Sequence, residues 1–202
     1  MERAADVRGF ARDRSLVRRP SGAQDGNRAG SLPDEYVGGL GDAGLASLKA
    51  FVESGGTLVA LDASAALVID TLKLPVTNVT QGLPADKFFC PGSLLRLDLD
   101  STTPLGFGMQ AETAAFFSFG SAWDVSGAPA ARVIARYARK DLLLSGWLEG
   151  EPIIAGLPAV IEMPAGRGRA ILIGFRAQHR GQSHVTFRLL FNAIFTSPRL
   201  SG

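Results

Sequence analysis

Cysteine, histidine and long apolar runs are scarce in this sequence of 202 residues. It contains one cysteine, Cys90, and two histidines, His179 and His184. A single cysteine excludes an intramolecular disulfide. No apolar run approaches the ~18 residues that a membrane-spanning helix requires. The first ten residues contain acids and lack an apolar segment, so they do not have the pattern of a secretory signal. The sequence leaves the localisation undetermined.

The charge of the chain is small and unevenly placed. The net charge is +2, and hydrophobic residues make up 46% of the chain, enough for a packed core. Residues 1–30 carry seven arginines against four acids, a net charge of +3, which leaves −1 for residues 31–202. We predict a basic, disordered segment at 1–30 and one domain at 31–202. A basic tail of this kind does not by itself indicate a nucleic-acid partner.

The pattern of the remaining residues is that of an α/β layered fold. Residues 42–72 predict a helix starting at Asp42, a strand at 57–61 and a second helix at 64–72. Residues 93–100 alternate apolar and polar side chains, as in a half-buried strand. Further strands are predicted at 114–119, 131–138, 142–148, 158–163 and 170–175, and a last helix at 185–195 with Leu189, Leu190, Phe191 and Ile194 facing inward. The last two strands are predicted to form a hairpin whose arginines, Arg167 and Arg169, are solvated. We expect Trp147 to pack between layers, and the apolar face of the first helix to consist of Leu45, Leu48, Phe51 and Val52.

The loop after the apolar strand at 170–175 is the strongest candidate for a functional site, because it is rich in polar side chains. Chemistry in open α/β sheets lies just past the carboxyl ends of the strands. The loop supplies the ligand-binding candidates Arg176, His179, Arg180 and Gln182. Two arginines can clamp a carboxylate, but they can equally pair with an acid of the sheet, Asp62 or Glu162.

Five stretches of the chain occur in an order that matches a known family. They are Leu32–Gly41, Leu48–Ala60, Phe89–Ser93, Leu142–Trp147 and Gly166–Phe195. Together they resemble the C-terminal region of bacterial zinc carboxypeptidase-like proteins of the carboxypeptidase A type. That region is similar to a class I glutamine amidotransferase-like, flavodoxin-like domain that follows the metallopeptidase domain.

The resemblance implies what this chain should contain and what it should lack. The fold implied is a partial amidotransferase-like layered sheet with helices and inserted antiparallel strands. The family's first strands have no counterpart in residues 1–29, so we expect a fragment or a truncated gene product. The family binds zinc through His-x-x-Glu and a third histidine, and neither His179 nor His184 has Glu three residues on. We therefore expect no metal and no cofactor in this chain; the zinc would belong to the peptidase domain.

A working amidotransferase places a cysteine on a sharp strand-to-helix turn, close to a histidine. Here that turn falls at residues 62–65, where Ser64 is the only hydroxyl nucleophile and no glycine flanks it. Asp62 or Ser64 can instead cap the following helix. Cys90, between Phe89 and Pro91, is typical of a small buried hydrophobe. We therefore predict no catalytic residue.

The sequence predicts a non-catalytic accessory domain of a zinc carboxypeptidase-like peptidase, with that peptidase domain as its partner in cis or in trans. The parent protein would hydrolyse C-terminal peptide bonds. The alternative is a stand-alone binding module whose degenerate amidotransferase pocket holds a small anion or a peptide carboxylate through Arg176, His179, Arg180 and Gln182. An active amidotransferase or esterase that uses Ser64 or Cys90 with His179 ranks last.

Overall fold

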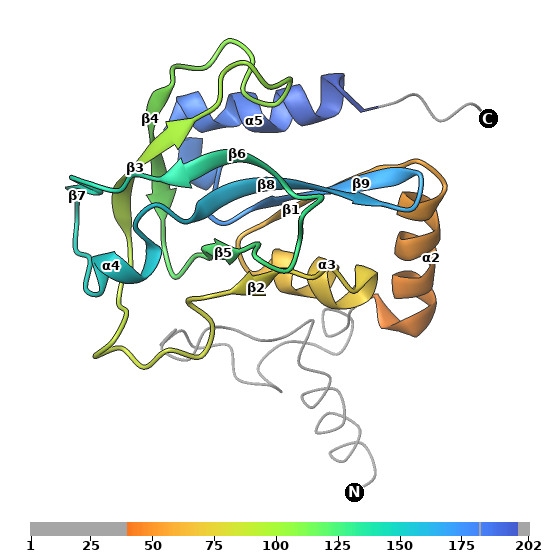
Figure 1. Cartoon of the computed structure of the whole chain (residues 1–202), viewed down its shortest axis with the longest axis horizontal. Coiled ribbons are helices and arrows are strands. Elements are labelled where there is room, and N and C mark those ends of the chain that lie inside the picture. Colours follow the sequence, from red (N-terminus) through yellow and green to blue (C-terminus); the bar gives the residue numbers. More distant parts are fainter. Residues whose placement is uncertain (1–39, 182, 198–202) are drawn as a thin grey trace, which may run out of the picture.

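The computed structural model describes residues 40–181 and 183–197. The predicted segment at 1–30 and the candidate Gln182 lie outside these residues. The elements, labelled as in Figure 1, are α2 (Gly41–Glu53), β1 (Thr57–Leu61), α3 (Ser64–Leu72), β2 (Thr77–Asn78), β3 (Ser93–Leu99), β4 (Glu112–Phe117), β5 (Trp123–Asp124), β6 (Arg132–Tyr137), β7 (Leu143–Ser145), α4 (Glu151–Ile154), β8 (Pro158–Ala165), β9 (Gly168–Ile173), the 3₁₀ turn η2 (His179–Gly181) and α5 (His184–Phe195).

A seven-stranded sheet forms the centre of the molecule. Its strand order is β1-β9-β8-β6-β3-β4, with β7 also paired to β3. The pair β1–β9 is parallel, and the other pairs of this sheet are antiparallel. Helices α3 and α5 lie on opposite sides of the sheet, and the short pair β2–β5 lies on the side of α3 (Figure 1). The predicted α/β class with inserted antiparallel strands is confirmed.

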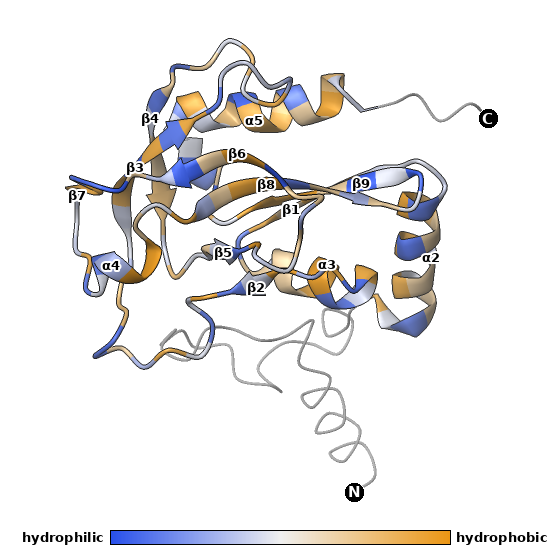
Figure 2. Ribbon diagram, viewed as in Figure 1, coloured by the Kyte–Doolittle hydropathy of each residue, from blue (hydrophilic) through white to orange (hydrophobic). Residues whose placement is uncertain are grey.

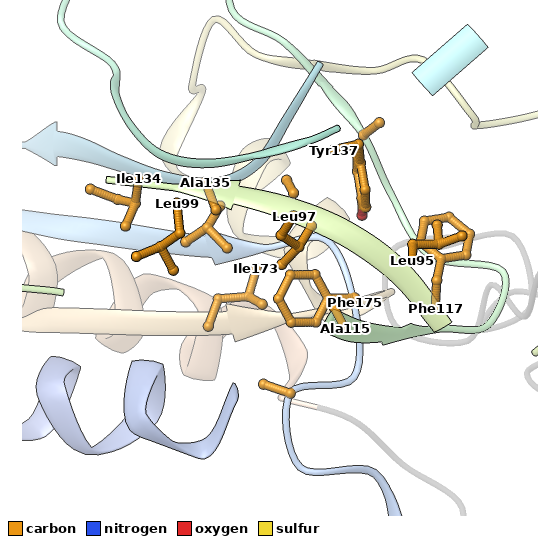
Figure 3. Close-up of a cluster of buried hydrophobic side chains, with 14 of the residues drawn as sticks. Leu95, Leu97, Leu99, Ala115, Phe117, Ile134, Ala135, Tyr137, Ile173 and Phe175 are labelled. Atoms are coloured by element: carbon orange, nitrogen blue, oxygen red, sulfur yellow. The ribbon is translucent and has the colours of Figure 1, made fainter. Parts of the chain in front are cut away.

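The alternation of β3 places its leucines in the core. Leu95, Leu97 and Leu99 are buried, whereas Asp98 between them is exposed. Figure 3 shows these leucines packed with apolar side chains of β4, β6 and β9. Strand β8, in the middle of the sheet, is apolar along most of its length (Figure 2), as expected for a strand covered on both sides.

The predicted hairpin at the end of the domain is formed by β8 and β9. Ala165 pairs with Gly168, so the loop is only Gly166-Arg167, and Gly166 takes a positive φ of 58°. The prediction that both arginines of this hairpin are solvated is wrong for Arg169. Its guanidinium pairs with Glu162 at 3.1 Å and donates to the carbonyl oxygen of Thr196 at 2.7 Å.

The structure corrects three other expectations about apolar side chains. Phe191 and Ile194, expected inside, are 57% and 66% exposed, because α5 buries Thr186, Leu189 and Ala193. Trp147, expected between layers, is 60% exposed. Helix α2 starts one residue before Asp42 and buries only Val52. In residues 40–181 and 183–197, no helix is long and apolar enough to cross a membrane.

Leu97→Ala is expected to lower the free energy of unfolding by about 2–5 kcal/mol, because it leaves a cavity in the fully buried core. Leu144→Ala, at a site that is 43% exposed, should change it by less than about 0.5 kcal/mol. Urea denaturation of both variants measures the difference. Equal effects would contradict the placement of β3 in the core.

Candidate functional site

The strand-to-helix turn after β1 is built around Asp62. This residue takes a positive φ of 51°, which is uncommon for a residue with a side chain. Its N–H donates to the carbonyl oxygen of Ile173 at 2.8 Å, and its carbonyl oxygen accepts from the N–H of Ala65 at 3.2 Å. Asp62 therefore sits where β1 and β9 both end, in the turn at which the sequence resemblance places the family's nucleophile.

An ion pair links this turn to the candidate loop. Arg176 Nε donates to Asp62 Oδ2 at 2.8 Å, with the two side chains 44% and 14% exposed. Among the described residues, the buried Oδ1 of Asp62 has no hydrogen-bond partner. Burial raises the pKa of Asp62 above its ordinary value, and Arg176 opposes that shift. The sequence left two acids, Asp62 and Glu162, as possible partners of the loop arginines, and Arg176 pairs with Asp62.

Ser64 is engaged by the backbone of β1. Its hydroxyl accepts a hydrogen bond from the N–H of Leu61 at 2.9 Å and donates to the carbonyl oxygen of the same residue at 2.6 Å. The N-cap of α3 is Ala63, which makes no side-chain capping bond. The expected helix cap by Asp62 or Ser64 is therefore wrong. Ser64 instead forms hydrogen bonds with the N–H and the C=O of Leu61, the last residue of β1.

His179 lies flat on an aromatic ring rather than beside a nucleophile. Its ring stacks on Phe116 of β4 at a centroid distance of 4.1 Å and an interplanar angle of 7°. Partial burial, together with the nearby charges of Arg180 and Arg176, lowers the pKa of His179. Nothing in the sequence marked Phe116 as its partner, because the two residues meet only through the pairing of distant strands.

Cys90 is fully buried in the core cluster, as predicted. Burial raises the pKa of its thiol, an effect that Ser93 partly opposes. A raised pKa keeps the sulfur as the thiol, whereas nucleophilic cysteines are held as thiolates. This environment is that of a structural cysteine.

The predicted ligand residues share one loop but do not all face one point. Arg176 turns to Asp62 and His179 to Phe116, while Arg180 is exposed with a φ of 48°. Two open hollows lie elsewhere on the surface. The larger, ≈ 540 Å³, is lined by β3 and β6 and includes Asp98, Asp100, Glu112 and Arg136. Within the described chain, no three His, Cys, Asp or Glu side chains are grouped to hold a metal ion.

Comparison with known proteins gives structural likeness alone. No family model and no curated protein matches the chain. A ThuA-like protein from Bacteroides uniformis is 13% identical with a TM-score of 0.49, over 76% of this chain and 62% of that one. A β-galactosidase from Bacillus circulans sp. alkalophilus is 12% identical with a TM-score of 0.47, over 76% and 20%. A cytoplasmic protein from Salmonella typhimurium is 16% identical with a TM-score of 0.46, over 77% and 61%.

The chain thus spans less than two thirds of each of these structures. Identities and TM-scores this low identify no activity for it. The resemblance to zinc carboxypeptidase-like proteins is untested by these comparisons and stays a prediction.

Arg176→Ala should destabilise the fold at pH 7, because it leaves the ionised Asp62 without its partner. We expect a loss of about 1–2 kcal/mol, at the low end for charged hydrogen bonds since water partly screens Arg176. The pKa of Asp62 is already raised in the folded state, so the loss should shrink as the pH falls from 7 toward 3.8 and the folded protein takes up the proton.

Urea denaturation between pH 7 and pH 4 measures this dependence. Arg167→Ala, which removes an exposed arginine from the hairpin loop, is the matched control and should have an effect below about 0.5 kcal/mol. A loss of stability in Arg176→Ala that is independent of pH would mean that the ion pair does not control the ionisation of Asp62.

Proposed function

We propose that this chain is a non-catalytic accessory domain of a zinc carboxypeptidase-like peptidase, located on the same polypeptide or on a separate one. The peptidase domain would hold the zinc and hydrolyse C-terminal peptide bonds with a metal-activated water. The five sequence stretches that resemble the C-terminal region of such proteins support this assignment.

The observation that carries the non-catalytic assignment is the state of the turn after β1. Nucleophilic catalysis requires a nucleophile within hydrogen-bond reach of a base. The turn holds Asp62 in an ion pair with Arg176, and the other candidates are engaged elsewhere. Ser64 is bonded to Leu61, Cys90 is buried, and His179 is stacked on Phe116.

The purified chain should hydrolyse neither hippuryl-phenylalanine nor glutamine, with or without added Zn²⁺. It should form a stable complex with the zinc carboxypeptidase-like polypeptide of the same organism, as measured by size-exclusion chromatography with light scattering. Hydrolysis accompanied by stoichiometric zinc would overturn the proposal. So would glutaminase activity that is abolished in His179→Ala. The absence of any complex would exclude a peptidase partner on a separate polypeptide.

A second function is favoured by the geometry of Arg176. Only its Nε bonds Asp62, and its side chain is 44% exposed. The terminal nitrogens of Arg176 can therefore meet a carboxylate or another small anion. In this second candidate function, the loop after β9 is a binding site for a peptide carboxylate.

Thermal shift with hippurate, glutamate and phosphate tests this second function. Binding should raise the melting temperature of the wild-type chain and of Arg167→Ala, and the shift should disappear in Arg176→Ala. If none of the three anions produces a shift at millimolar concentration, the loop is not an anion site.

A further inference from the structure

The two carboxyl oxygens of Asp62 have different surroundings. Oδ2 accepts a hydrogen bond from Arg176 Nε at 2.8 Å. Oδ1 is buried and has no hydrogen-bond partner among the described residues. An ionised carboxylate spreads its negative charge over both oxygens, and a buried charge needs hydrogen-bond donors to be stable. The ionised form of Asp62 is therefore well stabilised at Oδ2 and poorly stabilised at Oδ1.

A proton on Oδ1 would remove this charge and keep the contact with Arg176. A protonated carboxyl group has one O–H donor and one oxygen that still accepts. The proton belongs on Oδ1, because Oδ2 already faces the N–H of Arg176. Oδ2 then continues to accept from Arg176 Nε as a neutral group. Asp62 can thus lose its charge without releasing the side chain of Arg176.

Arg176 dominates the electrostatic surroundings of Asp62. Burial raises the pKa of Asp62, and the charge and hydrogen bond of Arg176 oppose that shift. Behind the turn, the charge of Asp62 acts on Tyr137 of β6, whose pKa burial raises, as it does that of Cys90. Both groups are therefore neutral at pH 7. On the α3 side, Ser64 does not titrate and is bonded to Leu61.

The charged groups of the loop are all basic. Arg176 and Arg180 act on His179 and, together with partial burial, lower its pKa. His179 is therefore neutral at pH 7 and gains a positive charge only in acid. Within the described chain, Asp62 is the acid that pairs with a residue of this loop. Any anion that approaches Arg176 consequently meets one fixed negative charge, that of Asp62.

An anion on the terminal nitrogens of Arg176 would share the guanidinium with Asp62. These nitrogens are free of Asp62, which bonds Nε, and the side chain is 44% exposed. Two negative charges on one guanidinium repel each other, and a like charge nearby favours the protonated form of a carboxyl group. The Asp62 side chain is only 14% exposed, so water screens this repulsion poorly. A bound anion should therefore draw a proton onto Asp62.

We propose that the loop after β9 binds a carboxylate together with a proton, which Asp62 takes up at Oδ1, so that Asp62 both positions Arg176 and sets the pH range in which the site is filled. This inference rests on the second candidate function, the anion site in this loop. Coupling between two binding events is reciprocal. Protonation of Asp62 should strengthen binding of the carboxylate about 10-fold, and the bound carboxylate should strengthen binding of the proton by the same factor.

Isothermal titration calorimetry of the full chain with hippurate, between pH 8 and pH 4.5, measures the coupling. Carboxyl groups of this kind titrate near about 3.5, so hippurate stays ionised over this range, whereas phosphate titrates near about 6 and is unsuitable. The affinity of the wild type should rise about 5-fold as the pH falls. Titrations in buffers of different ionisation enthalpy should show uptake of up to about one proton at the acidic end.

Asp62→Asn has the shape of the protonated side chain and cannot ionise. It should bind hippurate at pH 8 about 10-fold more tightly than the wild type does, and its affinity should change less than about 2-fold with pH. Arg167→Ala, in the hairpin loop, is the matched control and should keep the pH dependence of the wild type. A pH dependence that persists in Asp62→Asn and disappears in His179→Gln would assign the proton to His179 and overturn the proposal.

The outcomes separate this inference from the anion site itself. Hippurate binding that is equally tight at every pH overturns the coupling and leaves the anion site standing. The absence of binding in both the wild type and Asp62→Asn, at every pH, overturns the anion site and the coupling with it. If Asp62→Asn does not fold, a ¹³C NMR titration of the wild-type carboxyl groups decides. Saturation with hippurate should raise the pKa of Asp62 by about one, and an unchanged pKa overturns the proposal.

Discussion

The close approach of three chain segments at Gly174, directly after β9, determines the rest of the arrangement. The N–H of Gly174 donates to Ala159 at 2.8 Å, and its carbonyl oxygen accepts from the N–H of Ser121 at 2.6 Å. A Cβ here would lie 2.1 Å from the carbonyl oxygen of Ser121, so only glycine fits. This contact ties β8 and the segment after β4 to the end of β9, and the adjacent bond from Asp62 to Ile173 sets the start of the loop with Arg176 next to the end of β1.

Much of the secondary structure could be predicted from the sequence because its signals are local. The bounds of β1 and α3 agree with the prediction, and the alternation of β3 correctly identified its buried face. The hairpin β8–β9 followed from two apolar runs separated by a glycine-containing loop. Each of these depends on neighbours within a few residues, which the sequence supplies directly.

Features that depend on distant segments could not be predicted in the same way. Helix α5 has apolar residues around most of its circumference, so periodicity could not select the buried face. The small residues Thr186 and Ala193 are buried there, and the Thr186 hydroxyl donates to Ala177 at 2.7 Å. In the candidate site, Asp62 and Arg176 are 114 positions apart. The sequence alone left both Asp62 and Glu162 as possible partners of Arg176. Choosing between them required the strand order, which places the end of β1 next to the end of β9.

The two tryptophans of the chain lie in opposite surroundings. Trp123 is 1% exposed in the cluster beneath α3, whereas Trp147 is 60% exposed and its indole N–H donates to Glu149 at 3.0 Å. A soluble quencher such as iodide therefore reaches one fluorophore and not the other in the native state. Intrinsic fluorescence can thus report structural changes near β7 separately from unfolding of the core, without any added label.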